Sequence, residues 1–173
     1  MAELIIIGMG GHSKVVTDIA ILNGYKILGY LDDNEPVGEG RELYLGKIDM
    51  LPRWIRDDIK FIIAIGNNLV RKSIVEKLEG LELDYARLIH PATVIGSGVE
   101  ILGGSVVMPG AIINADARIG RHVIVNTAAV VDHDCRVGDF VHVAQGAVLA
   151  GGVVVESCGH VEVGVRVRGW REG

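Results

Sequence analysis

The chain has 173 residues and a net charge of −5, and 49% of its residues are hydrophobic although only 5% are aromatic. This length is enough for one large domain or two small ones with a sizeable core. The acidic balance offers no basic field for DNA or RNA, so we expect no nucleic acid partner. Neither a signal-peptide pattern nor a membrane-length apolar run occurs, and the two cysteines do not make a disulfide framework. We therefore expect a cytoplasmic protein without a membrane partner.

The first half of the chain alternates strand-like and helix-like segments. Apolar runs and helical periodicity predict strands at 4–7, 26–31, 61–65 and 85–89, and helices at 13–22, 48–55 and 69–78. Such alternation predicts a small parallel sheet with helices on its faces. We expect a Rossmann-like α/β domain over residues 1–89, joined to the rest at His90-Pro91, where proline restrains the preceding residue to extended geometry.

A glycine loop follows the first predicted strand, with the sequence GMGGH at residues 8–12. It is only a partial dinucleotide fingerprint, because the full pattern needs Gly or Ala where this chain has Ser13. Glycines before a helix still allow backbone N–H groups to bind a phosphate. Asp32 and Asp33 lie about twenty residues later, where a dinucleotide fold places its ribose-binding carboxylate. The loop indicates a site for the phosphate of some nucleotide, without indicating NAD in particular. A plain strand-to-helix turn and an NAD-binding sensor are the alternatives.

Residues 95–167 carry a six-residue repeat. Every sixth residue from Ile95 to Val167 is Ile, Val or Leu, and a small or slim side chain follows four residues after each. A period of six fits neither a helix nor simple strand alternation, but it fits a triangular parallel β-helix with one hexad per side. Residues eighteen apart should then stack in neighbouring coils. We expect this all-β domain over residues 90–173, with Cys135 as an inward core residue rather than a nucleophile.

Three segments together carry a resemblance to a known family. They are residues 8–14 (GMGGHSK), Asp32-Asp33, and the closely spaced residues 126–135 (NTAAVVDHDC) and 138–143 (GDFVHV). In order and spacing they resemble the sialic-acid and nucleotide-sugar O- or N-acetyltransferase family, which includes the bacillosamine-pathway N-acetyltransferases. The resemblance implies that the β-helix is left-handed and forms a homotrimer. It also implies that the first domain binds a nucleotide sugar and that acetyl-CoA lies between two subunits.

The resemblance also assigns roles by position. His133 would be the general base, Asp134 the carboxylate that orients it, and no metal would be needed. The implied substrate-binding residues are Gly10, Gly11, His12, Asp32, Asp33 and Asn126, and the implied acetyl-CoA contacts are His142 and Gly151. The expected reaction is direct acetyl transfer, in a ternary complex, to an amino or hydroxyl group of a nucleotide-linked sugar.

These residue types suit that chemistry independently of the family. A sugar amine or hydroxyl must lose a proton as it attacks a thioester, and neutral imidazole has a suitable pKa. An adjacent carboxylate fixes the tautomer of the imidazole and stabilises the imidazolium. The tetrahedral oxyanion needs a preorganised donor, which His142 or a backbone N–H could supply. The alternative for each histidine is a solvated turn residue.

The repeat places the two histidines on different sides of one prism. His133 and His142 are nine residues apart, which is half of an eighteen-residue coil. They can share a site only if one comes from a neighbouring subunit, which predicts a cyclic oligomer with interfacial sites. His160 lies eighteen residues after His142, so these two should stack one coil apart.

The final coils depart from the family pattern. Glu156 and Glu162 occupy positions where the relatives carry glycine after the aliphatic residue, and the chain continues only to Gly173. Degenerate or truncated final coils would weaken the acetyl-CoA site. The protein would then be a non-catalytic trimer that binds a nucleotide sugar. This is the alternative to the acetyltransferase.

Overall fold

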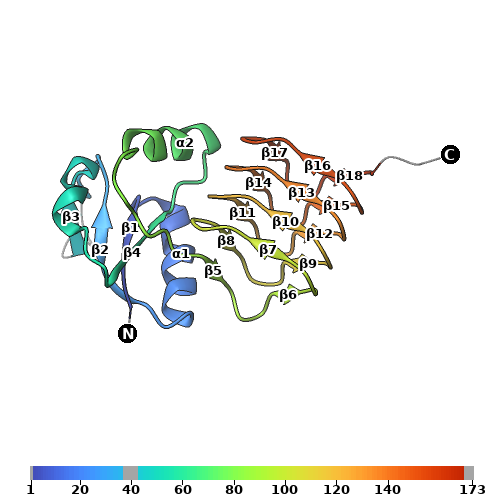
Figure 1. Ribbon diagram of the computed structural model, residues 1–173, viewed down its shortest axis with the longest axis horizontal. Coiled ribbons are helices and arrows are strands. Elements are labelled where there is room, and N and C mark those ends of the chain that lie inside the picture. The colour runs from blue at the N-terminus through green and yellow to red at the C-terminus, as the bar shows by residue number, and fades with distance from the viewer. Residues whose placement is uncertain (1, 37–42, 170–173) are drawn as a thin grey trace.

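The computed structural model describes residues 2–36 and 43–169, so the last four residues of the predicted 90–173 domain lie outside the described residues. An N-terminal α/β unit stands at one end and a stack of β-helix coils at the other (Figure 1). Among the described residues, no helix combines the length and the apolar character that a membrane span requires.

The N-terminal unit is a four-stranded parallel sheet of order β3-β2-β1-β4. Its strands are β1 (Glu3–Ile7), β2 (Lys26–Leu31), β3 (Tyr44–Gly46) and β4 (Ile59–Ile63), and its helices are α1 (Gly11–Leu22), the 3-10 helix η2 (Ile48–Trp54) and α2 (Asn68–Lys77). One face of the sheet packs on α1, and the other packs on η2 and α2. Burial on both faces explains the apolar runs at 4–7 in β1 and 61–63 in β4.

Sequence analysis missed one strand of this unit and assigned another to the wrong sheet. The short edge strand β3 was not predicted, because its three residues carry too little pattern. The predicted fourth strand at 85–89 does not close the sheet: Tyr85 makes only an isolated bridge with Phe61, and β5 (Leu88–Ile89) pairs with β8 of the β-helix. The β-helix therefore begins before His90-Pro91.

The rest of the chain is a parallel β-helix with two-residue strands. After β5 these are β6 (Val94–Ile95), β7 (Glu100–Ile101), β8 (Val106–Val107), β9 (Ile112–Ile113), β10 (Arg118–Ile119), β11 (Ile124–Val125), β12 (Val130–Val131), β13 (Arg136–Val137), β14 (His142–Val143), β15 (Val148–Leu149), β16 (Val154–Val155), β17 (His160–Val161) and β18 (Arg166–Val167). They form three sheets, of orders β16-β13-β10-β7, β17-β14-β11-β8-β5 and β18-β15-β12-β9-β6. Each strand pairs with the strand eighteen residues away, as the repeat predicted.

The interior of the β-helix is the predicted column of aliphatic and small side chains. From Ile101 to Leu149 the hexad aliphatic residues are all buried, and the small position between them holds residues such as Ala129 and Cys135. The second residue of each strand points inward, so the first residue points outward. The strand pairing continues without interruption to β18, and Glu156 and Glu162 are exposed on the last coils.

An apolar contact joins the two units. Side chains of α1 and β1 form one buried cluster with Val106, Met108 and Ile124, which lie on the β17-β14-β11-β8-β5 side of the prism. This apolar contact covers the outward residues of β8 and β11, and the outward residues of the next two strands of the sheet, His142 and His160, lie beyond it.

Candidate active site

The glycine loop joins β1 to α1 and is fixed by Asp32. Met9 N donates a hydrogen bond to Asp32 Oδ2 at 2.7 Å, and Asn34 N donates to Asp32 Oδ1 at 2.8 Å. At Gly10 and at Gly11, a Cβ atom would meet no atom within 4 Å. The start of α1 is therefore open for a ligand to approach its backbone, as the predicted role of these glycines requires.

The two acidic residues after β2 anchor loops. Asp33 Oδ1 accepts a hydrogen bond from Ile48 N at 3.1 Å, and Lys77 Nζ lies 3.6 Å from Asp33 Oδ2. Because Asp32 already holds the glycine loop, both carboxylates have partners within the chain. Their predicted contact with ribose or base stays a prediction.

A pocket of about 330 Å³ adjoins the first two turns of α1, which is a size that suits a small ligand. It is lined by Met9, Ser13, Lys14, Thr17, Asp18, Tyr30 and Leu43. Thr17 Oγ1 and Tyr30 OH lie 2.8 Å apart on one wall. Met9 belongs to the glycine loop, so this loop contributes to the wall of the pocket.

His12 occupies the first turn of α1 with its ring turned inward. Its Nε2 is buried and has no hydrogen-bond partner among the described residues. Burial, followed by the positive charge of Arg71, lowers the pKa of His12 to about 4. The ring is therefore neutral at physiological pH.

Asn126 and His142 form a hydrogen-bonded pair on the outer side of the β-helix. Asn126 Oδ1 accepts from Thr127 N at 2.8 Å, so Nδ2 is the amide atom that faces His142 Nε2, at 2.9 Å. Because an amide nitrogen only donates, Nε2 must be the unprotonated ring nitrogen. Burial, then the charges of His160, Arg71 and His12, lower the pKa of His142 to about 4, against an opposing interaction with the Gly66 backbone.

These residues come together from both units of the chain. His12 lies close enough to His142 to influence its pKa, and the ring of His142 lies 4.9 Å from that of His160 in an edge-on arrangement. The predicted stacking of the two histidines one coil apart is confirmed by the pairing of β14 with β17. We call this group, His12, Asn126, His142 and His160, the inter-unit cluster.

His133 and Asp134 form a second group at the corner after β12. His133 Nδ1 lies 2.7 Å from Asp134 Oδ2, and Asp132 Oδ1 accepts from His133 N at 2.8 Å. The hydrogen bond with Asp134, and then the charge of Asp132, raise the pKa of His133. A Cβ atom on Gly151 would lie 2.6 Å from His133 Nε2, so this nitrogen faces the glycine of the next coil.

The two groups face different sides of the prism. His133 lies between β12 and β13, whereas His142 belongs to β14, and these three strands belong to three different sheets. This agrees with the expectation from their nine-residue spacing. A site that uses both histidines thus needs two copies of the chain.

Comparison with known proteins extends over both units. Residues 3–78 match the family described as the PglD N-terminal domain. UDP-N-acetylbacillosamine N-acetyltransferase of Bacillus subtilis (strain 168) is 41% identical over 111 residues, which cover 61% of this chain but only 51% of that protein. The chain thus matches about half the length of this curated relative.

Solved structures match almost the whole chain. A histidine mutant of perosamine N-acetyltransferase from Caulobacter crescentus, in complex with CoA and GDP-perosamine, is 33% identical with a TM-score of 0.88, over 97% of this chain and 80% of that one. The acetyltransferase domain of PglB from Neisseria gonorrhoeae FA1090, in complex with acetyl coenzyme A, is 31% identical with a TM-score of 0.81, over 97% and 96%.

The chain belongs to the nucleotide-sugar acetyltransferase family. The family resemblance found in the sequence is thereby confirmed, as is the predicted combination of a Rossmann-like parallel sheet with a left-handed parallel β-helix. The roles assigned to individual residues of this acetyltransferase-family chain stay predictions. Within residues 2–36 and 43–169, no group of three or more His, Cys, Asp or Glu side chains could hold a metal ion.

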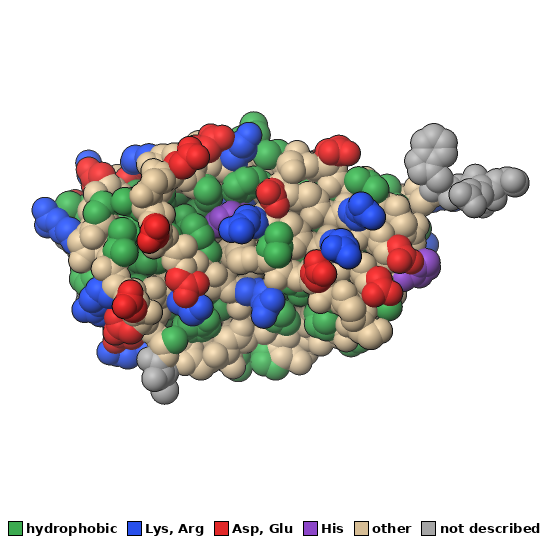
Figure 2. Space-filling model, viewed as in Figure 1, with side chains coloured by type: hydrophobic (Ala, Val, Ile, Leu, Met, Phe, Trp, Pro, Cys, Tyr) green, Lys and Arg blue, Asp and Glu red, His purple; other side chains and the backbone are tan. Residues whose placement is uncertain are grey.

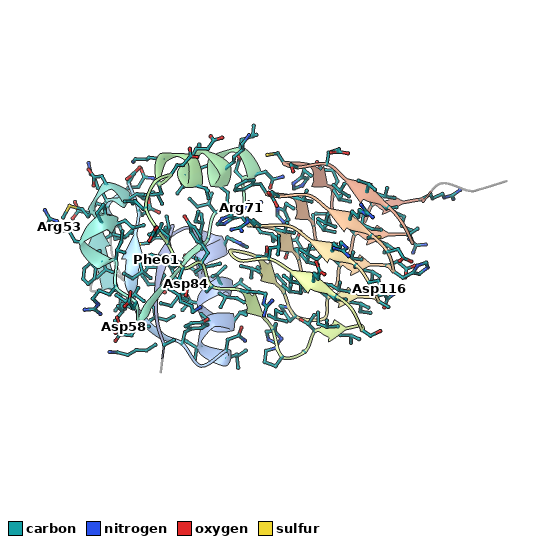
Figure 3. All side chains as sticks on the ribbon, viewed as in Figure 1. Arg53, Asp58, Phe61, Arg71, Asp84 and Asp116 are labelled. Atoms are coloured by element: carbon teal, nitrogen blue, oxygen red, sulfur yellow. The ribbon has the colours of Figure 1, made fainter. Side chains whose placement is uncertain are left out.

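Sequence reasoning missed Arg71, which the structure places at the centre of the junction between the two units of this family member (Figure 3). Its side chain is only 1% exposed. A signal was present, because Arg71 lies three residues before Ile74 and seven before Leu78, on the buried side of α2. A cation on an apolar helix face indicates a buried polar partner.

Proposed function

We propose that this protein transfers the acetyl group of acetyl-CoA to the amino group of a nucleotide-linked sugar, with His133 as the general base. The observation that carries the proposal is the His133–Asp134 pair, with Nδ1 bonded to the carboxylate at 2.7 Å and Nε2 directed at Gly151. The names of the relatives support the choice of an amino acceptor and of acetyl-CoA as donor. The cytoplasm is the compartment that such a reaction implies.

His133 would act through its neutral form. As the amine nitrogen bonds to the thioester carbonyl carbon, Nε2 accepts the amine proton, and Asp134 stabilises the resulting imidazolium. Collapse of the tetrahedral intermediate breaks the carbon–sulfur bond. The proton then passes from His133 to the departing sulfur, which leaves as the thiol of CoA and restores the neutral imidazole. No covalent acyl-enzyme is needed.

The nucleotide sugar would lie along the N-terminal unit. The open backbone at Gly10 and Gly11 suits the diphosphate, and the adjoining pocket beside α1 suits the nucleoside. From there the sugar would reach the inter-unit cluster, where Asn126 and His12 provide polar contacts. His142 and Gly151 would contact the thioester end of acetyl-CoA.

We further propose a homotrimer in which His133 of one subunit meets the inter-unit cluster of its neighbour. Support comes from the outward residues of β6, β9, β12 and β15, which belong to one sheet: Val94, Ile112, Val130 and Val148 form an aliphatic column that is not fully buried in one chain, and Arg166 of β18 follows at its end. Strands β7, β10 and β13 of a second sheet instead present Glu100, Arg118 and Arg136, and Val154 follows on β16. Charges of both signs are interspersed on the face seen in Figure 2, which is typical of a solvated surface.

The trimer has a direct test. Val130→Glu would place a charge in the middle of the aliphatic column, whereas Arg136→Glu changes the charge on the neighbouring face. We expect the first variant to dissociate in light scattering and the second to stay trimeric. A monomeric wild-type protein would contradict the proposed assembly.

The proposed reaction is tested by release of free CoA thiol from acetyl-CoA with UDP- and GDP-linked amino sugars as acceptors. We expect turnover by the wild type, and a loss of about 10² to 10⁴ in kcat for His133→Ala, with acetyl-CoA binding unchanged in calorimetry. His90→Ala, a histidine at the start of the β-helix, is the control. A folded protein that neither binds acetyl-CoA nor turns over would support the non-catalytic alternative.

A further inference from the structure

Arg71 is a buried cation held only by neutral groups. Among the described residues no carboxylate forms an ion pair with its guanidinium. Its acceptors are instead backbone carbonyls and one amide, spread over all three guanidinium nitrogens. Burial lowers the pKa of Arg71 to about 10, so it is still charged at neutral pH. A charge in this position is tolerated only because its donors are satisfied.

One side of Arg71 contacts a single corner of the β-helix in successive coils. Nε donates to His122 O at 2.8 Å, and Nη2 donates to Phe140 O at 2.8 Å. His122, Phe140 and Cys158 are spaced eighteen residues apart and all adopt left-handed backbone conformations, with φ of 54°, 61° and 63°. This corner therefore repeats with the same geometry and presents its carbonyl oxygens to α2.

Asn68 extends the contact to the third coil. Its Oδ1 accepts from Arg71 Nη2 at 3.0 Å, and its Nδ2 donates to Cys158 O at 3.2 Å and Gly159 O at 2.8 Å. Asn68 and Arg71 are three residues apart on α2, so they lie on one side of the helix. Together they bond to three consecutive coils.

The other side of Arg71 holds the loop that touches the inter-unit cluster. Nη1 donates to Ile65 O at 2.9 Å and Gly66 O at 3.1 Å. The Gly66 backbone interacts with His142, which is bonded to Asn126. In addition, Gly8 of the glycine loop packs against Ile65, since a Cβ atom on Gly8 would lie 2.9 Å from Ile65 Cγ1. One guanidinium thus links the β-helix corner to both loops of the predicted substrate site.

We propose that the Asn68–Arg71 pair is the positioning device that sets the nucleotide-binding unit against the β-helix, so that a bound sugar is presented at the inter-unit cluster. The apolar contact between the units supplies attraction but no fixed register, because hydrophobic burial is non-directional. The hydrogen bonds of Arg71 are directional and supply that register. This inference rests on the proposed function, in which the sugar is held by one unit and its amine reacts at the β-helix.

The expected effect is on turnover rather than on binding. When the Asn68–Arg71 pair is weakened, each unit should keep its own ligand contacts, but the reacting atoms should lose their alignment. A displacement of the reacting atoms by about 1 Å can lower the rate by about 10²-fold. We therefore expect Arg71→Lys and Asn68→Ala to lower kcat by about 10- to 100-fold while the KM for acetyl-CoA changes by less than about twofold. Lysine keeps the charge but cannot supply the five donors of the guanidinium.

The experiment compares these two variants with Lys72→Met, which removes an exposed cation from the same helix and should behave as the wild type. Arg71→Met is a further variant, and because it could fail to fold, the test depends on the two milder ones. Kinetics are measured with each substrate varied in turn, and folding is checked by thermal unfolding. An active wild type with folded Arg71→Lys and Asn68→Ala variants at full kcat would overturn the inference while leaving the proposed function intact.

A second measurement distinguishes failure of the proposed function from failure of the positioning role. If the wild type itself does not transfer acetyl groups, the proposed function fails, and amide hydrogen exchange still tests the pair. We expect faster exchange in Arg71→Lys at the amides of residues 65–68 and 139–142, and no change there in Lys72→Met. Equal exchange in the wild type and Arg71→Lys would overturn the positioning role.

Discussion

His133 lies directly against Gly151, its counterpart one coil further along the same corner of the β-helix. A Cβ atom added to Gly151 would lie 2.6 Å from His133 Nε2 and 2.7 Å from Cε1. The nitrogen in this contact is the one that we propose as the base, because Nδ1 is bonded to Asp134. Any side chain at position 151 must therefore move the imidazole.

We expect Gly151→Ala to lower kcat by about 10² with little change in thermal stability. The backbone of Gly151 is outside the left-handed region, so alanine fits the main chain there. The His133 side chain is 61% exposed and can swing away, which relieves the clash but displaces the base. Steady-state kinetics and thermal unfolding provide the measurement.

A double mutant isolates the cause of this effect. In the His133→Ala background, Gly151→Ala should have no further effect on kcat, since the displaced group is already gone. An equal loss in both backgrounds would show that Gly151 acts on something other than His133.

Asp134→Asn tests the carboxylate that orients His133. The hydrogen bond with Asp134 is the main cause that raises the pKa of His133, and the reaction needs the unprotonated ring. Removing the negative charge lets the ring lose its proton at lower pH. The rising limb of kcat/KM against pH should therefore move to lower pH in Asp134→Asn, while its plateau falls by about 10-fold or more.

A matched control lies one coil earlier. Asp116 occupies the same corner and, like Asp134, has a left-handed backbone with φ of 60°, a conformation that asparagine tolerates. Asp116→Asn should leave both the limb and the plateau in place. An unshifted limb in Asp134→Asn would mean that another group titrates in the observed range.

The fold was predictable where residues that contact each other lie at a fixed spacing in the sequence. The aliphatic column from Ile101 to Leu149 and the eighteen-residue register follow from the six-residue period, because each coil repeats the same three sides. Leu88–Ile89 was misassigned because a short apolar pair suits either sheet, and only packing on β8 decides between them. Local pattern cannot make that decision.

The site was predictable only in part for the same reason. His133 and Asp134 are adjacent in sequence, so their pairing is local. The partners of Arg71 on the β-helix are carbonyl oxygens 51 and 69 residues further along the chain, at His122 and Phe140. Backbone carbonyls are present at every residue and carry no sequence signal, so the side chain alone could only indicate that some buried acceptor was required.

Cys135→Ala distinguishes direct transfer from a covalent acyl-enzyme. The Cys135 thiol points into the β-helix interior, fully buried, and donates to Ala150 O at 3.2 Å, and burial raises the pKa of this thiol. Ala117 fills the equivalent position one coil earlier. We expect alanine to lower the free energy of unfolding by about 1 kcal/mol and to leave kcat within about twofold of wild type. Loss of turnover together with an acyl adduct on wild-type Cys135 in mass spectrometry would contradict direct transfer.

His122 should make the junction sensitive to acid. Its ring is 3% exposed, lies 4.5 Å from that of Tyr85 and stacks on Phe140 at 5.2 Å, and its Nδ1 has no hydrogen-bond partner among the described residues. Burial, then the charge of Arg71, lower its pKa from 6.5 to about 4. The unfolded chain therefore binds a proton at a higher pH than the folded chain, so stability is complete above about pH 6.5 and is lost as the pH falls toward 4.

His122→Asn should remove this part of the acid sensitivity. Asparagine tolerates the left-handed backbone at position 122, so the variant should fold, although the lost packing lowers its stability at every pH. Between about pH 7.5 and pH 5, the drop in the free energy of unfolding should be smaller than in the wild type by about 2 kcal/mol. Urea unfolding at the two pH values measures both quantities. Parallel drops in the two proteins would mean that the pKa of His122 is the same in the folded and the unfolded chain, contrary to the lowering that burial and the charge of Arg71 cause.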